Sequence, residues 1–81
     1  MPSSSMSKMP ALKPKKVLHA LLRVGFYVYH QKGSHAQLRH PVKPHLRVTI
    51  PVHNRFDLPP QVVASIVRQA EMTREEFLDL F

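Results

Sequence analysis

The chain has 81 residues, no cysteine and a formal net charge of +7. A chain this short forms one small domain that buries only about 60% of its unfolded surface, and the absence of cysteine excludes a disulfide framework, a thiol nucleophile and a thiolate zinc site. No apolar run approaches the ~20 residues of a bilayer span, and the N-terminus lacks the apolar stretch of a secretory signal. We therefore expect a cytoplasmic protein with no membrane partner.

Basic residues dominate the first two-thirds of the chain. Twelve Lys and Arg residues stand against five acidic residues, which are Asp57, Glu71, Glu75, Glu76 and Asp79. Such a field attracts a polyanion, and the ordinary candidates are nucleic acid, an anionic membrane surface and an acidic protein. Charge alone does not choose among them, and a small basic domain without a specific polyanion also fits.

The N-terminal residues 1–9 are rich in Ser and Met and predict a disordered tail, with Met6 or Met9 as an alternative start. Residues 10–81 then form a single domain.

Residues 13–24 predict an amphipathic helix, with Pro14 in the first turn and Gly25 as a left-handed stop. Its apolar positions recur at three- and four-residue spacing: Val17, Leu18, Leu21, Leu22 and Val24.

Three strands are predicted next, over residues 26–32, 34–40 and 46–50, with a turn at Gly33 and a proline-stiffened hairpin at 41–45. The two-residue alternation of strands separates their faces. One face should point to the helices, and it carries Phe26, Val28, Ala36, Leu38, Leu46, Val48 and Ile50. The open face carries Tyr27, Tyr29, His35, Gln37, Arg39, Arg47 and Thr49.

Two further helices complete the predicted fold. The apolar spacing over residues 59–70 predicts a helix, and Thr73 with Glu76 has the spacing of a capping box that begins a short last one. Phe77, Leu78, Leu80 and Phe81 should then close the edge of the core. The order predicts an α+β fold, α-β-β-β-α, with helices on one face of a three-stranded antiparallel sheet. This is also the order of a double-stranded RNA-binding domain.

Several short motifs carry a more specific resemblance. They are Gly25-Phe26, Gln31-Lys32-Gly33-Ser34-His35, Val48-Thr49-Ile50-Pro51-Val52-His53, Gln69-Ala70 and Glu75-Glu76-Phe77-Leu78. In this order and spacing, from about Leu12 to the C-terminus, the chain resembles the HicA family of bacterial mRNA interferase toxins. The resemblance implies a toxin that cleaves mRNA without the ribosome and is neutralised by a HicB-type antitoxin. It also implies that His35 is the catalytic histidine.

The chemistry of the neighbouring residues is compatible with that role. Cleavage of RNA through its own 2′-hydroxyl needs a base of near-neutral pKa, and an ordinary imidazole has a pKa of about 6.5. Lys32, Arg39 and Arg47 offer cations for the phosphate. Gly33 allows a phosphate backbone to approach, and Ser34 either bonds the phosphate or holds the turn. Gln37 joins them on the RNA-binding face.

Other interpretations remain open. His53 is a weaker candidate for the second acid or base, because it also fits a loop-shaping or antitoxin-contacting role. The six histidines lack the spacing of metal ligands, so we predict no metal and no other cofactor. The alternative function is a non-catalytic RNA-binding module of the same fold. We expect a monomer when the protein is free and a hetero-oligomer with the antitoxin.

Overall fold

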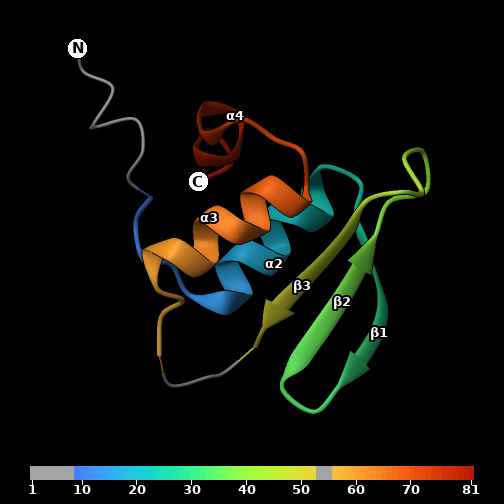
Figure 1. The fold of residues 1–81 in the computed structure, drawn as a ribbon, viewed down its shortest axis with the longest axis horizontal. Coiled ribbons are helices and arrows are strands. Elements are labelled where there is room, and N and C mark those ends of the chain that lie inside the picture. The colour runs from blue at the N-terminus through green and yellow to red at the C-terminus, as the bar shows by residue number, and fades with distance from the viewer. Residues whose placement is uncertain (1–8, 53–55) are drawn as a thin grey trace.

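The computed structural model describes residues 9–52 and 56–81, and its elements follow the predicted order. They are α2 (Pro14–Arg23), β1 (Tyr27–Lys32), β2 (His35–Arg39), β3 (Arg47–Pro51), α3 (Pro60–Gln69) and α4 (Arg74–Leu78). The strands form one antiparallel sheet in the order β1-β2-β3 (Figure 1). The α+β prediction is therefore confirmed.

The first helix begins and ends where the sequence predicts. Pro14 occupies its first turn, where the missing N–H costs nothing. Gly25 has φ +104°, and the N–H groups of Gly25 and Phe26 donate to the carbonyls of Leu22 and Leu21. This pattern is a Schellman motif, which needs a residue with positive φ after the helix.

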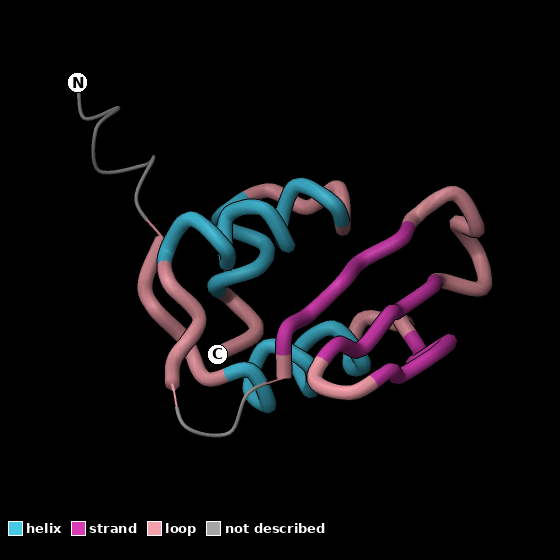
Figure 2. Tube along the Cα trace, turned by 60° about the horizontal axis from the view of Figure 1, so that its bottom comes forward, coloured by secondary structure: helices cyan, strands magenta, loops and turns pink. Residues whose placement is uncertain are grey.

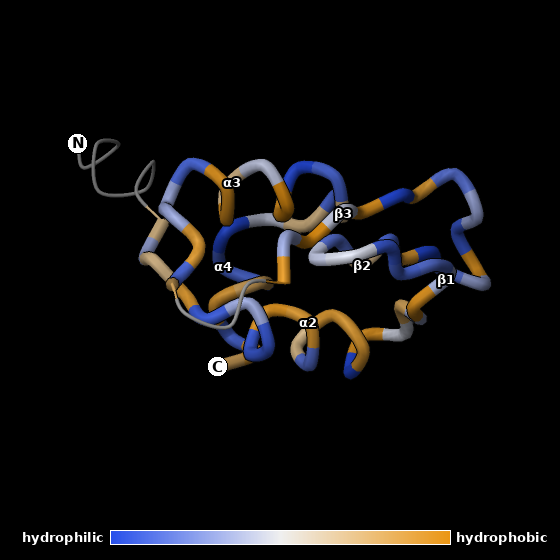
Figure 3. The backbone as a smooth tube through the Cα atoms, turned by 90° about the horizontal axis from the view of Figure 1, so that it is seen from below, coloured by the Kyte–Doolittle hydropathy of each residue, from blue (hydrophilic) through white to orange (hydrophobic). Residues whose placement is uncertain are grey.

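The core lies where α2 and α3 meet β3 (Figure 1). Apolar positions recur along both helices (Figure 3), and those that face inward are buried with the inner positions of β2 and β3. The largest fully buried side chains are Phe77, Leu21, Leu38, Ile50, Ile66, Val17, Val48 and Val63. The apolar alternation predicted for the second and third strands is thus confirmed.

The first strand departs from the predicted alternation. Every residue of β1 is exposed, and Val28, predicted to be in the core, is 40% exposed. Its register partner Leu38 is buried, so Val28 lies on the face of the sheet that points to the helices, as predicted. β1 is nevertheless the edge strand furthest from the helices (Figure 1), which leaves that side uncovered.

The chain ends also differ in detail from the prediction. Met9, assigned to the tail by sequence, is buried in the core, and residues 1–8 lie outside the described part. Leu12 pairs with Leu58 through two backbone hydrogen bonds of 3.3 and 2.7 Å, which tie this N-terminal segment to the approach to α3. At the other end Phe77 is fully buried, but Phe81, expected at the core edge, is half exposed.

Candidate functional site

The turn between β1 and β2 sets the position of His35. Gly33 has φ +58°, a left-handed conformation that glycine adopts without strain. The carbonyl of Ser34 accepts a hydrogen bond from the N–H of Val52, just after β3. The turn is therefore anchored to the neighbouring strand, and His35 follows it as the first residue of β2 at one end of the sheet.

The predicted site residues of β2 share the open face of the sheet, as the sequence indicates. Ala36 and Leu38 are buried, so the alternation directs His35, Gln37 and Arg39 away from the core. The strand register then groups the open face into three cross-strand rows. They are Tyr27–Arg39–Arg47, His30–Gln37–Thr49 and Lys32–His35–Pro51.

His35 thus lies between Lys32 and Pro51 in the row next to the turn. Lys32, Gly33 and Ser34 lie in or beside the same turn. Arg39 and Arg47 are neighbours in the row at the opposite end of the strands, with Gln37 in the row between. The structure places seven of the eight predicted residues on this sheet and its β1–β2 turn, but it separates the two arginines from His35 by one intervening row.

A β-bulge in β1 adds a residue that sequence reasoning missed. The register shifts between Val28 and His30, so that His30, rather than Tyr29, stands opposite Gln37. His30 therefore joins the open face. Simple alternation placed it on the other side, and nothing in the polar and aromatic run around it marks the bulge.

The ring of the bulge residue Tyr29 is in contact with an arginine side chain. The guanidinium carbon of Arg39 lies 4.2 Å from the centroid of the Tyr29 ring, a cation–π contact. Arg39 is half-buried, whereas Arg47 is exposed. The contact holds Arg39 over the sheet, and it covers one face of a ring that the sequence suggested for base stacking.

The charge on this sheet has one sign. No residue of the three strands is acidic. Three of the five carboxylates contact basic side chains away from the strands: Asp57 with Lys13 at 3.6 Å, Glu71 with His45 at 3.3 Å and Glu75 with Arg74 at 3.9 Å. The open face therefore attracts a polyanion without competition from its own side chains.

Two sequence-based predictions cannot be placed on this geometry. His53, the candidate second acid or base, lies outside the described residues. Among residues 9–52 and 56–81, no three His, Asp or Glu side chains are grouped so that they could hold a metal ion. Metal independence stays a prediction, for which a chelator is the test.

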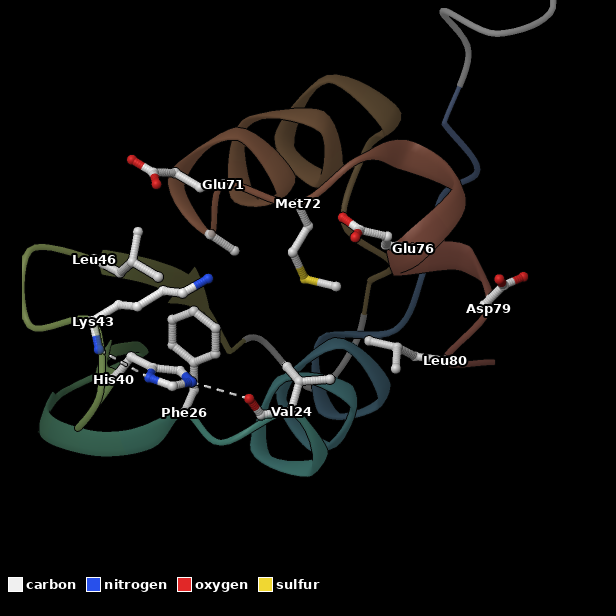
Figure 4. Close-up of a pocket in the computed structure, with 11 residues that line it drawn as sticks. Val24, Phe26, His40, Lys43, Leu46, Glu71, Met72, Glu76, Asp79 and Leu80 are labelled. Carbon is white, nitrogen blue, oxygen red and sulfur yellow. Dashed lines mark hydrogen bonds between the residues drawn. The ribbon is translucent and has the colours of Figure 1, made fainter.

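The far end of the sheet holds a pocket of a different character (Figure 4). Its walls include Phe26, Leu46, Met72 and Leu80, and its rim carries the carboxylates of Glu71, Glu76 and Asp79 beside Lys43. Like-charge repulsion makes this acidic rim a poor site for phosphate. The β2–β3 loop, which extends beyond the sheet (Figure 2), forms one side of it through Lys43.

His40 lines this pocket and has a structural role. Its Nδ1 accepts hydrogen bonds from the N–H groups of Val42 and Lys43, at 3.2 and 3.3 Å. Its Nε2 therefore carries the proton and donates to the carbonyl of Val24 at 3.1 Å. The ring also packs edge-on against Phe26 at 5.0 Å. His40 ties the loop after β2 to the end of α2.

A family model for the HicA toxin of bacterial toxin–antitoxin systems matches residues 14–72 of this chain. The chain belongs to the HicA toxin family. The match covers more than two-thirds of the sequence, from α2 through α3, and includes the Gly33-Ser34-His35 turn. It ends before α4, so the motif at Glu75–Leu78 lies beyond it. No curated protein matches the chain.

Membership in the HicA family makes this protein the toxin of a toxin–antitoxin system. Among the described residues, no helix is both long and apolar enough to cross a membrane.

Proposed function

We propose that this HicA-family toxin is a metal-independent endoribonuclease that cleaves mRNA, with His35 as its catalytic acid–base residue. The observation that carries the proposal is the position of His35. It is exposed on an open, carboxylate-free sheet, next to a glycine turn and opposite Lys32. An imidazole beside a cation is the minimum that this chemistry requires.

The proposed reaction uses the 2′-hydroxyl of the RNA. The 2′-oxygen attacks the adjacent phosphorus as a base removes its proton, and the bond from phosphorus to the 5′-oxygen breaks. The products are a 2′,3′-cyclic phosphate and a 5′-hydroxyl, and the departing oxygen takes up a proton. His35 supplies one of these transfers, with water or His53 as the second group.

The remaining predicted residues bind RNA in this proposal. Lys32 is the cation nearest to His35 in the register and stabilises charge on the scissile phosphate. Arg39 and Arg47, two rows further along, bind flanking phosphates, and Gln37 lies in the row between them and His35. Ser34 positions the turn, because its carbonyl is the group bonded to Val52.

An antitoxin of the HicB type inhibits the enzyme in this account. The +7 charge and the open face, which carries arginines and no carboxylate, favour a partner that presents Asp or Glu to the same residues that bind phosphate. The free toxin is then a monomer and the inhibited form a hetero-oligomer. The proposed substrate places the working protein in the cytoplasm, where cleavage needs no ribosome.

The test compares His35→Ala with His19→Ala on a purified transcript in EDTA. His19 is an exposed histidine of α2, off the sheet, and it is the matched control. We expect His35→Ala to lose cleavage by a factor on the order of 10²–10⁴, the range for one acid–base group, while His19→Ala cleaves like the parent. Equal loss in both variants, or activity that EDTA abolishes, would contradict the proposal.

A second candidate function is a non-catalytic RNA-binding module. The observation in its favour is that the His35 imidazole makes no hydrogen bond with any described residue, so none of them orients it. In that case the parent protein binds RNA in a salt-dependent manner but leaves it intact, and His35→Ala changes nothing except affinity. The same assay decides between the two functions.

A further inference from the structure

A hollow lies on the helix side of the β1–β2 turn, across the turn from His35. Six residues line it: Lys15, Leu18, Gln31, Gly33, Ser34 and Val52. Lys15 and Leu18 belong to α2, Gln31 to β1 and Val52 to the segment after β3. Gly33 and Ser34 are shared by the hollow and by the turn that positions His35.

The strand register shows on which face of the sheet Gln31 lies. Gln31 stands opposite Ala36, which is fully buried and faces the helices, so Gln31 points to the same side of the sheet. It is exposed because β1 is an edge strand. An amide with both donors and an acceptor thus stands at the border of the hollow, at an inner position of the sheet where a packed fold would place an apolar residue.

The rest of the lining combines an apolar floor with a cation. Leu18 and Val52 are half-buried and offer surface for the face of a ring. Lys15 is exposed and, within the described chain, makes no ion pair, whereas Lys13 is 3.6 Å from Asp57. These groups suit the parts of a nucleotide: the apolar surface can contact the face of the base, the amide can bond its polar edge, and the cation can bind a phosphate.

Gly33 leaves the path between the hollow and His35 open. Apart from its two chain neighbours, a Cβ at this position would meet no heavy atom of the described chain within 4 Å. The bare backbone at the crest of the turn therefore gives a nucleic acid strand close passage from one side of the sheet to the other.

We propose that this hollow is a subsite for a nucleotide that flanks the scissile phosphate, with the RNA crossing the turn at Gly33. The base lies on Leu18 and Val52, Gln31 bonds its polar edge, and Lys15 binds a phosphate. This assignment rests on the proposed ribonuclease function, because a scissile phosphate exists only if the protein cleaves RNA. It concerns binding, however, and is tested without cleavage.

The first test titrates the full-length protein with each of the four nucleoside 3′-monophosphates, followed by NMR. We expect the amide signals of Leu18, Gln31 and Val52 to shift, with unequal affinities for the four bases. Lys15→Ala should weaken all four by a similar factor of roughly two to five. Gln31→Ala should make the four affinities equal. Matched controls are Lys16→Ala, on the same helix outside this hollow, and Gln61→Ala, an exposed amide of α3.

Absence of shifts at these residues, or the same weakening with Lys16→Ala, would overturn the subsite. Loss of cleavage has no bearing on this readout, so the subsite and the proposed catalytic function fail separately. If the titration succeeds and the parent protein cleaves no RNA, the subsite stands and the catalytic proposal falls.

The second test addresses the crossing at Gly33. Asparagine tolerates positive φ better than other residues with a side chain, so Gly33→Asn should preserve the turn while placing a side chain in the open path. We expect its unfolding midpoint to stay near that of the parent and its affinity for a short single-stranded RNA to fall. Parent-like RNA affinity in a folded Gly33→Asn protein would refute the crossing.

Discussion

The helices α2 and α3 end in the same type of turn, but the residue with positive φ differs between them. After α2 the residue with positive φ is Gly25, and after α3 it is Glu71 with φ +56°. Around Glu71 the N–H of Met72 donates to Val67 and the N–H of Glu71 to Arg68, which is again a Schellman motif. After α3, Glu71 therefore adopts a left-handed conformation that costs a residue with a side chain about 1–2 kcal/mol.

Opposite substitutions at these two turns should have opposite effects on stability. Gly25→Ala should destabilise the protein by roughly 1–3 kcal/mol, because the new Cβ has an unfavourable φ and would lie 2.7 Å from Nε2 of His40. Glu71→Gly should stabilise it by up to about 1 kcal/mol, less the small contribution of the exposed His45 pair. Urea unfolding measures both, and a stable Gly25→Ala protein would contradict the account of His40.

The capping box of α4 gives one carboxylate a defined dependence on pH. Oε1 of Glu76 accepts from the N–H of Thr73 at 2.8 Å, and Oγ1 of Thr73 accepts from the N–H of Glu76 at 3.0 Å. The backbone hydrogen bond from Thr73, followed by the one from its side chain, lowers the pKa of Glu76 from its ordinary 4.5. The charged form is thus favoured by folding.

Glu76 should therefore stabilise the protein above about pH 4.5 and lose that contribution as the pH falls through its lowered pKa. Glu76→Gln keeps the hydrogen-bonding spacing but not the charge. We expect it to be less stable than the parent at pH 7 in thermal unfolding, with a deficit that shrinks as the pH falls through the lowered pKa of Glu76. Glu75→Gln, in the same turn, is the control. A Glu76→Gln deficit that persists unchanged at pH 3 would contradict the assignment.

At the scale of elements, the helices could be predicted from sequence because their ends carry local signals. Pro14, Gly25 and the Thr73–Glu76 pair act within one turn of the residues they stop or start. The exposure of β1 could not be predicted, because it depends on which strand lies at the edge. The bulge at Tyr29 could not either, since a one-residue shift is set by cross-strand pairing.

The segment before α2 is a further element that alternation and helix spacing do not reveal. Met9 is buried, and Leu12 pairs with Leu58, so both depend on contacts with distant residues. The reference for a test of this segment is a protein beginning at Met9. A protein beginning at Lys13 should be less stable by roughly 2–5 kcal/mol, the range for removing a buried apolar side chain, in urea unfolding. Equal stability of the two would show that this segment contributes nothing.

At the scale of the whole molecule, the carboxylates are kept off the open face of the sheet. The strands carry no carboxylate, while three of the five acidic residues rim the pocket by α4. This distribution of charge orients an approaching polyanion toward the open face and the turn that carries His35. Three of the site residues predicted from the sequence lie together at that turn: Lys32, Gly33 and His35.

The most direct test of the account is the chemical nature of the cut RNA ends. The parent protein in EDTA should leave 2′,3′-cyclic phosphate and 5′-hydroxyl ends on a single-stranded transcript, and His35→Ala should leave the transcript intact. Replacing the 2′-hydroxyls by hydrogen should stop cleavage by the parent. Products with 5′-phosphate ends, cleavage of the 2′-deoxy strand or full activity in His35→Ala would contradict the central role of His35 and the 2′-hydroxyl.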